Sequence, residues 1–193
     1  MEHFYKNIQG YFNFEFLYSD VVKIFPNDAK FLEIGAWQGK SSSYMAVEII
    51  NSKKNISFYC VDTWDGGSEM AHYNIVKSGK LYETFTSNIS SVKDYIIPIK
   101  LPSVSAANTF PDNYFDFIFI DGDHTYESVV NDLHAWYPKL KKNGIFAGHD
   151  YGVKIGVAKA VNEFISQKQL NLRVCKSTWI CDKTSLITTN INN

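Results

Sequence analysis

The sequence predicts an α/β protein: one domain in which helices cover both faces of a doubly wound, mostly parallel sheet of the Rossmann type. Short apolar runs alternate with segments of helical length along the chain. Most of these runs are apolar throughout rather than at every second position, which is typical of strands buried on both faces. A length of 193 residues, 45% of them apolar, suits a single well-filled core and argues against disorder.

Five runs are expected to form parallel strands, with helices between them. The strands are KFLEIG (30–35), ISFYCVD (56–62), YIIPIKL (95–101), FDFIFID (115–121) and GIFAGHD (144–150). The helices are SSSYMAVEIINSKK (41–54), KLYETFTSNISSV (80–92), YESVVNDLHAWYPKLKK (126–142) and KIGVAKAVNEFISQK (154–168). Strand, helix, strand, repeated in this way, builds a parallel sheet.

The two ends of the chain complete the predicted domain. Residues 170–183 read as two strands joined by a short connection, which predicts an antiparallel hairpin at the edge of the sheet. Residues 1–29 carry a weak helical pattern and several aromatics, and we expect a cap over the sheet rather than a separate domain. The domain proper then spans 30–187, and 188–193 form a polar tail.

Charge and composition exclude several classes of function. The 19 basic and 20 acidic residues leave a net charge of −1, and Arg173 is the only arginine, so we expect no nucleic-acid partner. No apolar run is long enough to span a membrane, and the N-terminus lacks the features of a secretory signal. We therefore expect a cytoplasmic protein with no membrane partner. Cys60, Cys175 and Cys181 lack disulfide or metal spacing and are interpreted as small buried side chains.

The turn after the first expected strand carries the first functional signal. It reads EIGAWQGKSSS (33–43), in which Gly35 and Gly39 permit a tight strand-to-helix turn and a close backbone approach. The following helix start offers unpaired N–H groups to a ligand. The turn is not a dinucleotide fingerprint, because bulky residues such as Trp37 separate the glycines. It is not a phosphate-binding loop either, because that loop needs a glycine at the position of Ile34.

Two acidic residues end the first two expected strands. Glu33 ends a buried strand, where a carboxylate is rare without a partner or a function, although it could simply accept hydrogen bonds from loop N–H groups. Asp62 stands where an acidic side chain accepts hydrogen bonds from a ribose diol, although it could instead cap the next turn. Together with the glycine turn, these residues describe a pocket for a nucleoside without phosphates.

Four segments of this sequence resemble a known family. FLEIGAWQGKSSS (31–43), CVDTWDG (60–66), FIDGDHTYESV (119–129) and GHDY (148–151) are similar, in kind and order, to class I S-adenosylmethionine-dependent methyltransferases. The first resembles the cofactor loop of catechol and caffeoyl-coenzyme A O-methyltransferases. The combination is closer to sugar O-methyltransferases of macrolide and glycan pathways. The similarity covers about residues 30–185.

The resemblance implies S-adenosyl-L-methionine as the methyl donor and indicates which residues bind it. Gly35, Gly39 and Ser41 would surround its methionine part. Asp62 would bind the ribose hydroxyls, and Ser103 would lie beside the adenine. The full set of implied cofactor-binding residues is Glu33, Gly35, Ala36, Trp37, Gly39, Ser41, Asp62, Thr63, Trp64, Ser103 and Asp121.

Acidic and histidine residues follow the fourth and fifth expected strands. Asp121 and His124 follow the fourth strand, and His149 and Asp150 follow the fifth. Because the carboxyl ends of neighbouring parallel strands lie side by side, we expect these four side chains to converge on one small volume. Such convergence is what a metal site or an acid–base site requires.

The resemblance also implies roles for these four residues. Asp121 and His124 would be catalytic, with His124 as the base that takes the proton of the acceptor hydroxyl, at a position where plant and animal relatives carry Lys. Asp121, His149 and Asp150 would bind Mg²⁺ or Mn²⁺. His149 departs from the all-oxygen shell that Mg²⁺ favours, so His149 is alternatively a second acid–base group without tight metal binding.

These features predict an O-methyltransferase that acts on a hydroxyl of a sugar, a glycan or another small polar acceptor. Two alternatives stay open: a non-catalytic nucleoside-binding module of a glycan pathway, and a metal-dependent hydrolase or oxygenase built on His124, His149 and a carboxylate. Aromatic residues could stack on the acceptor or pack in the core, and the early ones could form a homodimer contact. They are Tyr5, Tyr11, Phe12 and Tyr73.

Overall fold

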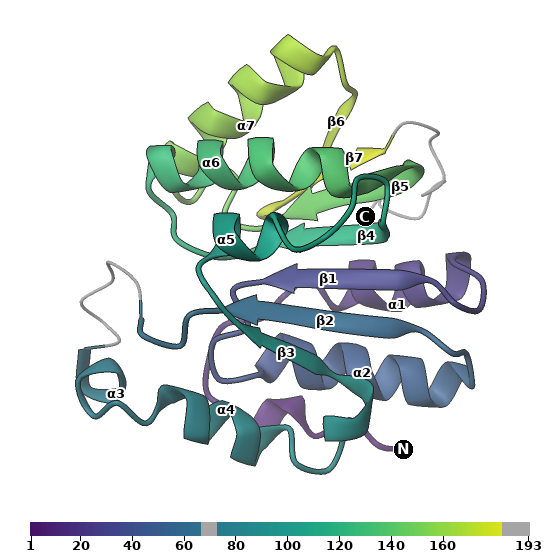
Figure 1. Cartoon of the computed structure of the whole chain (residues 1–193), viewed down its shortest axis with the longest axis vertical. Coiled ribbons are helices and arrows are strands. Elements are labelled where there is room, and N and C mark those ends of the chain that lie inside the picture. Colours follow the sequence, from purple (N-terminus) through teal and green to yellow (C-terminus); the bar gives the residue numbers. More distant parts are fainter. Residues whose placement is uncertain (67–72, 183–193) are drawn as a thin grey trace.

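The computed structural model of the chain describes residues 1–66 and 73–182. Within them, seven strands form one sheet in the order β3-β2-β1-β4-β5-β7-β6 (Figure 1). The strands β1 to β5 pair in parallel, whereas β7 pairs antiparallel with both β5 and β6. The predicted fold class, with its antiparallel C-terminal hairpin, is confirmed. The strands are β1 (Lys30–Ile34), β2 (Ser57–Asp62), β3 (Ile97–Lys100), β4 (Phe115–Ile120), β5 (Leu140–Gly148), β6 (Leu172–Cys175) and β7 (Thr178–Asp182).

Helices cover both faces of the sheet because successive strand residues point to opposite sides. In β4, Phe117 and Phe119 belong to one core cluster, and Ile118 and Ile120 belong to the other. The first cluster packs under α1 (Glu15–Ile24), α2 (Lys40–Ser52) and α4 (Leu81–Asn88). The second packs under α5 (Ser103–Ala107), α6 (Tyr126–Trp136) and α7 (Ile155–Lys168). The other helical elements within residues 1–66 and 73–182 are α3 (Tyr73–Lys77), η1 (Tyr5–Asn7), η3 (Lys93–Tyr95) and η4 (Tyr137–Lys139).

The N-terminal segment packs directly on the sheet. Leu17, Tyr18 and Val21 recur on one face of α1 and are fully buried. The ring of Phe14, which precedes α1, lies 4.4 Å from that of Phe119 in β4. Residues 1–29 therefore contribute side chains to one core of the molecule. No helix of the described chain is both long and apolar enough to cross a membrane.

Some element boundaries differ from the prediction. The helix expected over 126–142 ends at Trp136, because Pro138 lacks a backbone N–H and clashes with a continued helix. Leu140 then begins β5, four residues earlier than expected. The short helix α5 was not predicted. The hairpin connection consists of Lys176 and Ser177, so it is short as expected. The expected polar tail, 188–193, lies outside the described residues.

Candidate active site

The glycine turn after β1 lies against the end of β4. Gly35 has a φ of +90°, and a Cβ atom placed there would lie 2.0 Å from the backbone oxygen of Asp121. Next to this contact, the backbone N–H of Asp121 donates a hydrogen bond of 2.8 Å to the backbone oxygen of Ile34. Only a residue without a side chain allows this approach. Because the strand order reverses between β1 and β4, the turn occupies the point at which such sheets bind ligands.

The side chain of Asp62 holds this turn from the end of β2. Its Oδ2 accepts a hydrogen bond from the N–H of Trp37 over 2.8 Å, and its Oδ1 accepts one from the N–H of Trp64 over 2.7 Å. Burial raises the pKa of the Asp62 carboxyl, and the backbone hydrogen bonds oppose that rise. The loop-capping contact is therefore present. Each carboxylate oxygen has a second lone pair, so capping and ribose binding are compatible.

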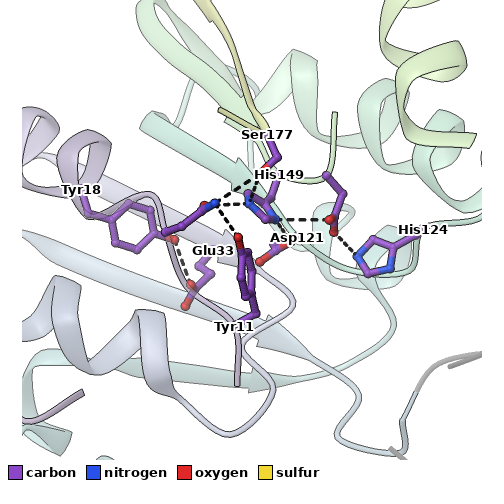
Figure 2. A network of polar contacts seen from close by, with 9 residues as sticks. Tyr11, Tyr18, Glu33, Asp121, His124, His149 and Ser177 are labelled. Atoms are coloured by element: carbon purple, nitrogen blue, oxygen red, sulfur yellow. Dashed lines mark hydrogen bonds and ion pairs between the residues drawn. The ribbon is translucent and has the colours of Figure 1, made fainter. Parts of the chain in front are cut away.

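Glu33 lies beneath the turn, away from solvent. Its carboxyl group is fully buried and accepts hydrogen bonds from the hydroxyls of Tyr18, over 2.8 Å, and Ser42. Burial raises the pKa of Glu33, while hydrogen bonds led by that of Ser41 lower it. Figure 2 shows Tyr18 pointing at Glu33. Glu33 does not line the cavity beyond the strand ends, and its carboxyl group joins α1 and α2 to β1.

A cavity of about 600 Å³ opens beyond the carboxyl ends of β1, β2, β4 and β5. This volume lies within the range of small-molecule sites. Most of the predicted cofactor-binding residues line it. Those residues are Gly35, Ala36, Trp37, Ser41, Asp62, Thr63, Ser103 and Asp121.

Two residues that were expected to bind the cofactor, Gly39 and Trp64, do not line the cavity. Gly39 precedes α2 at a φ of +85°, and a Cβ atom there would lie 2.8 Å from the side chain of Ile89. Trp64 is 3% exposed, packs on the ring of Phe85 at 4.6 Å and donates its indole N–H to the oxygen of Trp37. The sequence shows that these residues belong to the turns, but it does not show which side of each turn faces the cavity.

The ends of β4 and β5 bring Asp121, His124 and Asp150 together in the same cavity. The Nε2 atom of His124 lies 2.7 Å from Oδ2 of Asp150 (Figure 2). Asp121, His124 and Asp150 each offer one ligand atom, and these atoms lie within 4.8 Å of one another. Asp150 adopts a φ of +60°, a conformation that Asp tolerates better than most residues. This group can bind a cation or move a proton.

His149 is placed differently from the prediction. Its Nε2 lies 2.7 Å from Oγ of Ser177 and 2.9 Å from Oδ1 of Asn13, while Nδ1 is 3.6 Å from Asp121 and 3.5 Å from Asp150. Within residues 1–66 and 73–182, the group with metal-ligand geometry contains His124 in place of His149. The two-histidine triad of the alternative hydrolase or oxygenase is therefore not assembled among these residues. Contacts of His149 with the N-terminal segment and the β6–β7 turn are invisible in local sequence patterns (Figure 2).

Burial and neighbouring charges shift the pKa values of this centre in opposite directions. Burial raises the pKa of Asp121 to about 7, against the effect of the nearby histidines. Burial opposes ionisation of Asp150 too, but hydrogen bonds with His124 and His149 hold its pKa well below the usual range. Burial lowers the pKa of His149, yet its hydrogen bond with Asp150 and the charge of Asp121 leave that pKa raised. Asp150 therefore stays ionised at neutral pH and can orient His124.

Part of the cavity wall was not predicted from the sequence. A signal was available for Asp132, because it places a carboxyl group within the apolar stripe of Val129, Leu133 and Trp136 on α6. Most of the other missed residues come from loops and helix starts, where no periodic pattern marks the inward side, and Asn131 lies on α6 itself. The polar members of the missed set are Lys40, Asp123, Ser128, Asn131, Asp132 and Lys154.

The early aromatics divide between the cavity and the core. Tyr11 lines the cavity, is 74% exposed, and accepts a hydrogen bond from Nδ2 of Asn13 over 2.8 Å. Phe12 is buried, and the ring of Tyr5 lies 5.3 Å from it. Phe12 therefore packs inside the molecule rather than at a dimer contact. The side chain of Tyr73 lies outside the described residues.

The chain is similar to known proteins in sequence and in fold. A family model described as "Methyltransferase domain" matches residues 32–151. Protein R132 of Acanthamoeba polyphaga mimivirus is 31% identical over 153 residues, which are 74% of this chain and 62% of that protein, so the match spans less than two thirds of the relative.

Two solved structures share the fold. The O-methyltransferase NovP has a TM-score of 0.71 at 17% identity, over 88% of this chain and 79% of NovP. CalS11, described as a TDP-rhamnose 3'-O-methyltransferase of calicheamicin biosynthesis, has a TM-score of 0.61 at 15% identity, over 89% of this chain and 80% of CalS11. At these identities the likeness concerns the fold.

Proposed function

The chain belongs to the family of methyltransferase domains, and we propose that it is an S-adenosylmethionine-dependent O-methyltransferase acting on a hydroxyl of a sugar or another small polar acceptor. One observation carries this proposal. A single cavity joins the glycine turn and Asp62 to the group formed by Asp121, His124 and Asp150. Methyl transfer needs a donor site and a deprotonating group within one such enclosure.

The donor end of the cavity suits S-adenosylmethionine, which supplies a methyl group on a positively charged sulfur. The tight turn at Gly35 lets backbone approach the ligand closely, and the carboxylate of Asp62, already fixed by two backbone N–H groups, is positioned for the ribose hydroxyls. Ser41 contributes a hydroxyl at the start of α2. These groups hold the donor in one orientation, which converts the transfer into an intramolecular reaction.

At the reacting end, His124 takes the proton of the acceptor hydroxyl. The ionised Asp150 accepts from the Nε2–H of His124, which fixes the imidazole tautomer and leaves Nδ1 as the basic nitrogen. As the acceptor oxygen forms its bond to the methyl carbon and the carbon–sulfur bond breaks, the hydroxyl proton passes to this nitrogen. Asp150 also stabilises the imidazolium that results.

The donor set also fits a divalent cation. Asp121, His124 and Asp150 would hold it, and two carboxylates with one imidazole suit Mn²⁺ better than Mg²⁺, which favours oxygen ligands. A bound cation would lower the pKa of an acceptor hydroxyl. In that case His124 would be occupied as a ligand, so the base and the metal roles of His124 exclude each other and can be separated by experiment.

A sugar or similar acceptor is supported by the residues at the reacting end. Tyr11 offers an exposed ring on which a sugar face can stack, and Lys154 adds a polar group to the cavity wall. CalS11, which shares the fold, is described as acting on a nucleotide-linked sugar. A panel of hydroxylated acceptors should therefore include free sugars, glycosides and nucleotide sugars.

The test is a methyl-transfer assay with this panel, with and without a chelator, combined with calorimetric titration of S-adenosylhomocysteine. His124→Ala should lower kcat at least about 100-fold, the loss expected for a general base, and leave the affinity for S-adenosylhomocysteine within about twofold. His134→Ala, an exposed histidine on α6 away from the cavity, should change neither.

Three results would contradict the proposal. A wild-type protein that binds no S-adenosylhomocysteine and methylates no hydroxyl would overturn the function. The base assignment would be wrong if His124→Ala kept the wild-type kcat. It would also be wrong if the variant lost its affinity for S-adenosylhomocysteine together with its activity. If chelation abolishes activity, and Mn²⁺ restores it in the wild type but fails to bind His124→Ala, then His124 is a metal ligand rather than the base.

A further inference from the structure

A line of polar contacts joins the N-terminal segment to the reacting end of the cavity (Figure 2). Nδ2 of Asn13 donates to the hydroxyl of Tyr11 over 2.8 Å, and Oδ1 of Asn13 lies 2.9 Å from Nε2 of His149. Nδ1 of His149 lies 3.6 Å from Oδ1 of Asp121 and 3.5 Å from Oδ1 of Asp150. Asn13 thus reaches both carboxylates through one imidazole ring, although it does not itself line the cavity.

Segments that are distant in the chain hold the imidazole of His149. The residue is 4% exposed, and its ring lies 5.1 Å from that of Phe14. Ser177, in the turn between β6 and β7, places its Oγ 2.7 Å from the same Nε2 atom. The backbone oxygen of Ser177 also accepts from the N–H of Tyr151 over 3.0 Å, which fixes this turn beside the end of β5. Nε2 therefore has one partner from the N-terminal segment and one from the β6–β7 turn.

The hydrogen bonds at Nε2 decide which way the ring of His149 faces. An imidazole keeps nearly the same shape after half a turn about the bond that joins it to Cβ, but this turn exchanges each nitrogen for a carbon. The amide oxygen of Asn13 can only accept, so Nε2 carries a proton and donates it. After half a turn, carbon atoms would face both Asn13 and the two carboxylates. Asn13 and Ser177 therefore keep Nδ1 on the side of the carboxylates.

Asp150 needs a fixed orientation because it orients His124. Its two oxygens face different histidines: Oδ2 lies 2.7 Å from Nε2 of His124, and Oδ1 faces Nδ1 of His149. If the ring of His149 turned, Oδ1 would lose this contact and the carboxylate would be free to rotate. Asp121 and Asp150 also belong to the group that fits a cation, so both forms of the reacting end depend on the same contact.

We propose that Asn13 is a positioning residue of the reacting end, acting through His149, whose imidazole it holds with Nδ1 facing Asp121 and Asp150. This inference rests on the proposed function, because it concerns the group that deprotonates the acceptor. Asn13 touches no reacting atom. Its loss should therefore slow methyl transfer and leave the binding of the donor unchanged.

The first test compares two substitutions of Asn13 in the full chain, assayed with free sugars, glycosides and nucleotide sugars. Asn13→Leu removes both polar atoms and should lower kcat at least about tenfold, because small misplacements of reacting groups are costly. Asn13→Asp keeps an oxygen that accepts from Nε2 of His149, so its kcat should stay within about threefold of the wild type. Both variants should bind S-adenosylhomocysteine within about twofold of the wild type.

The second test needs no acceptor. Proton–nitrogen NMR of the ligand-free protein should show the Nε2–H of His149 protected from exchange with water, as a signal that His149→Gln lacks. Asn13→Asp should keep this signal, whereas Asn13→Leu should shift it or lose it to exchange. Ser177→Ala removes the other partner of Nε2 and should disturb the signal and lower kcat in the same direction.

Asn162→Leu is the matched control, because it also removes an asparagine that bonds a tyrosine. Oδ1 of Asn162 accepts from the hydroxyl of Tyr151 over 2.9 Å, at an exposed position on α7 outside the cavity wall. This variant should change neither kcat nor the NMR signal of His149.

The inference is wrong if Asn13→Leu keeps the wild-type kcat or leaves the His149 signal unchanged. It is also wrong if Asn13→Asp loses as much activity as Asn13→Leu. Should Asn13→Leu fail to fold, Ser177→Ala and the wild type decide, because an unprotected Nε2–H in the wild type overturns the inference. A wild type that methylates no member of the panel overturns the proposed function, whereas the NMR comparison still tests whether Asn13 holds His149.

Discussion

Gly35 shows how one residue type determines the geometry of the site. A side chain at this position would overlap the backbone of Asp121, and the positive φ adds a second penalty for any residue with a Cβ. Glycine was therefore readable from the sequence as a requirement of the turn. The partner in the close approach is the end of β4, 86 residues further along the chain, and only the fold identifies it.

Gly35→Ala should destabilise the protein far more than its conformation alone explains. Gly79 is the matched control, because it also has a positive φ of +68° but has nothing within 4 Å of the added Cβ. Gly79→Ala should cost about 1 kcal/mol through backbone strain. Gly35→Ala should cost at least about 2 kcal/mol more, because atoms at 2.0 Å must move apart. Thermal unfolding of both variants measures this difference, and equal melting temperatures would contradict it.

At the scale of elements, Glu33 joins three of them through one buried carboxyl group. Tyr18 reaches it from α1 and Ser42 reaches it from α2, while Glu33 itself belongs to β1. The N-terminal cap is thus tied to the strand that carries the glycine turn. This arrangement gives the first 29 residues a part in supporting the site as well as in covering the sheet.

Removing the hydroxyl of Tyr18 should lower the free energy of unfolding more than removing the hydroxyl of Tyr44, which also lies between α1 and α2. Tyr18→Phe withdraws a donor from a fully buried carboxyl group and should lower the free energy of unfolding by about 1–3 kcal/mol. Tyr44→Phe removes the half-buried hydrogen bond between Tyr44 and Ser19, also across α1 and α2, and should cost about 1 kcal/mol or less. Urea denaturation compares the two variants, and a larger loss for Tyr44→Phe would contradict the role given to Glu33.

At the scale of the whole molecule, the buried carboxyl groups around the cavity make the ligand-free fold less stable as they ionise. Burial raises the pKa of both Asp121 and Asp132 above the ordinary Asp value. Between about pH 4 and the folded pKa values of these two residues, their carboxyl groups keep a proton in the folded state but have lost it in the unfolded chain. Stability must fall as the pH rises through this window.

The contribution of Asp132 can be isolated with Asp132→Asn. In the unfolded chain an Asp titrates near 3.9, and in the folded protein Asp132 titrates near 6, so ionisation should cost up to about 3 kcal/mol. Between pH 4.5 and 7.5, the free energy of unfolding should fall less steeply in Asp132→Asn than in the wild type. Guanidinium denaturation across this range tests the difference. If the free energy of unfolding changed with pH in the same way in both proteins, burial would not raise the pKa of Asp132.

The fold class, the order of the main elements and the methyltransferase family could all be predicted from the sequence. Each of these depends on local information: apolar runs, helical periodicity and short motifs that keep their spacing. The sequence also placed Asp121, His124 and Asp150 at strand ends that a parallel sheet must bring together. Element boundaries were less certain, as the helix that stops before Pro138 illustrates, because they depend on the competition between a helix and the strand that follows it.

Which side of each motif faces the cavity depends on the folded arrangement of the whole chain. Gly39 and Trp64 support the cavity wall from behind, and His149 turns its Nε2 atom to Asn13 and Ser177 while His124 joins the two carboxylates. These choices depend on contacts between residues far apart in the chain, such as the 136 positions between Asn13 and His149. Local patterns fix which residues reach a strand end, whereas packing against distant segments fixes the direction in which each side chain points.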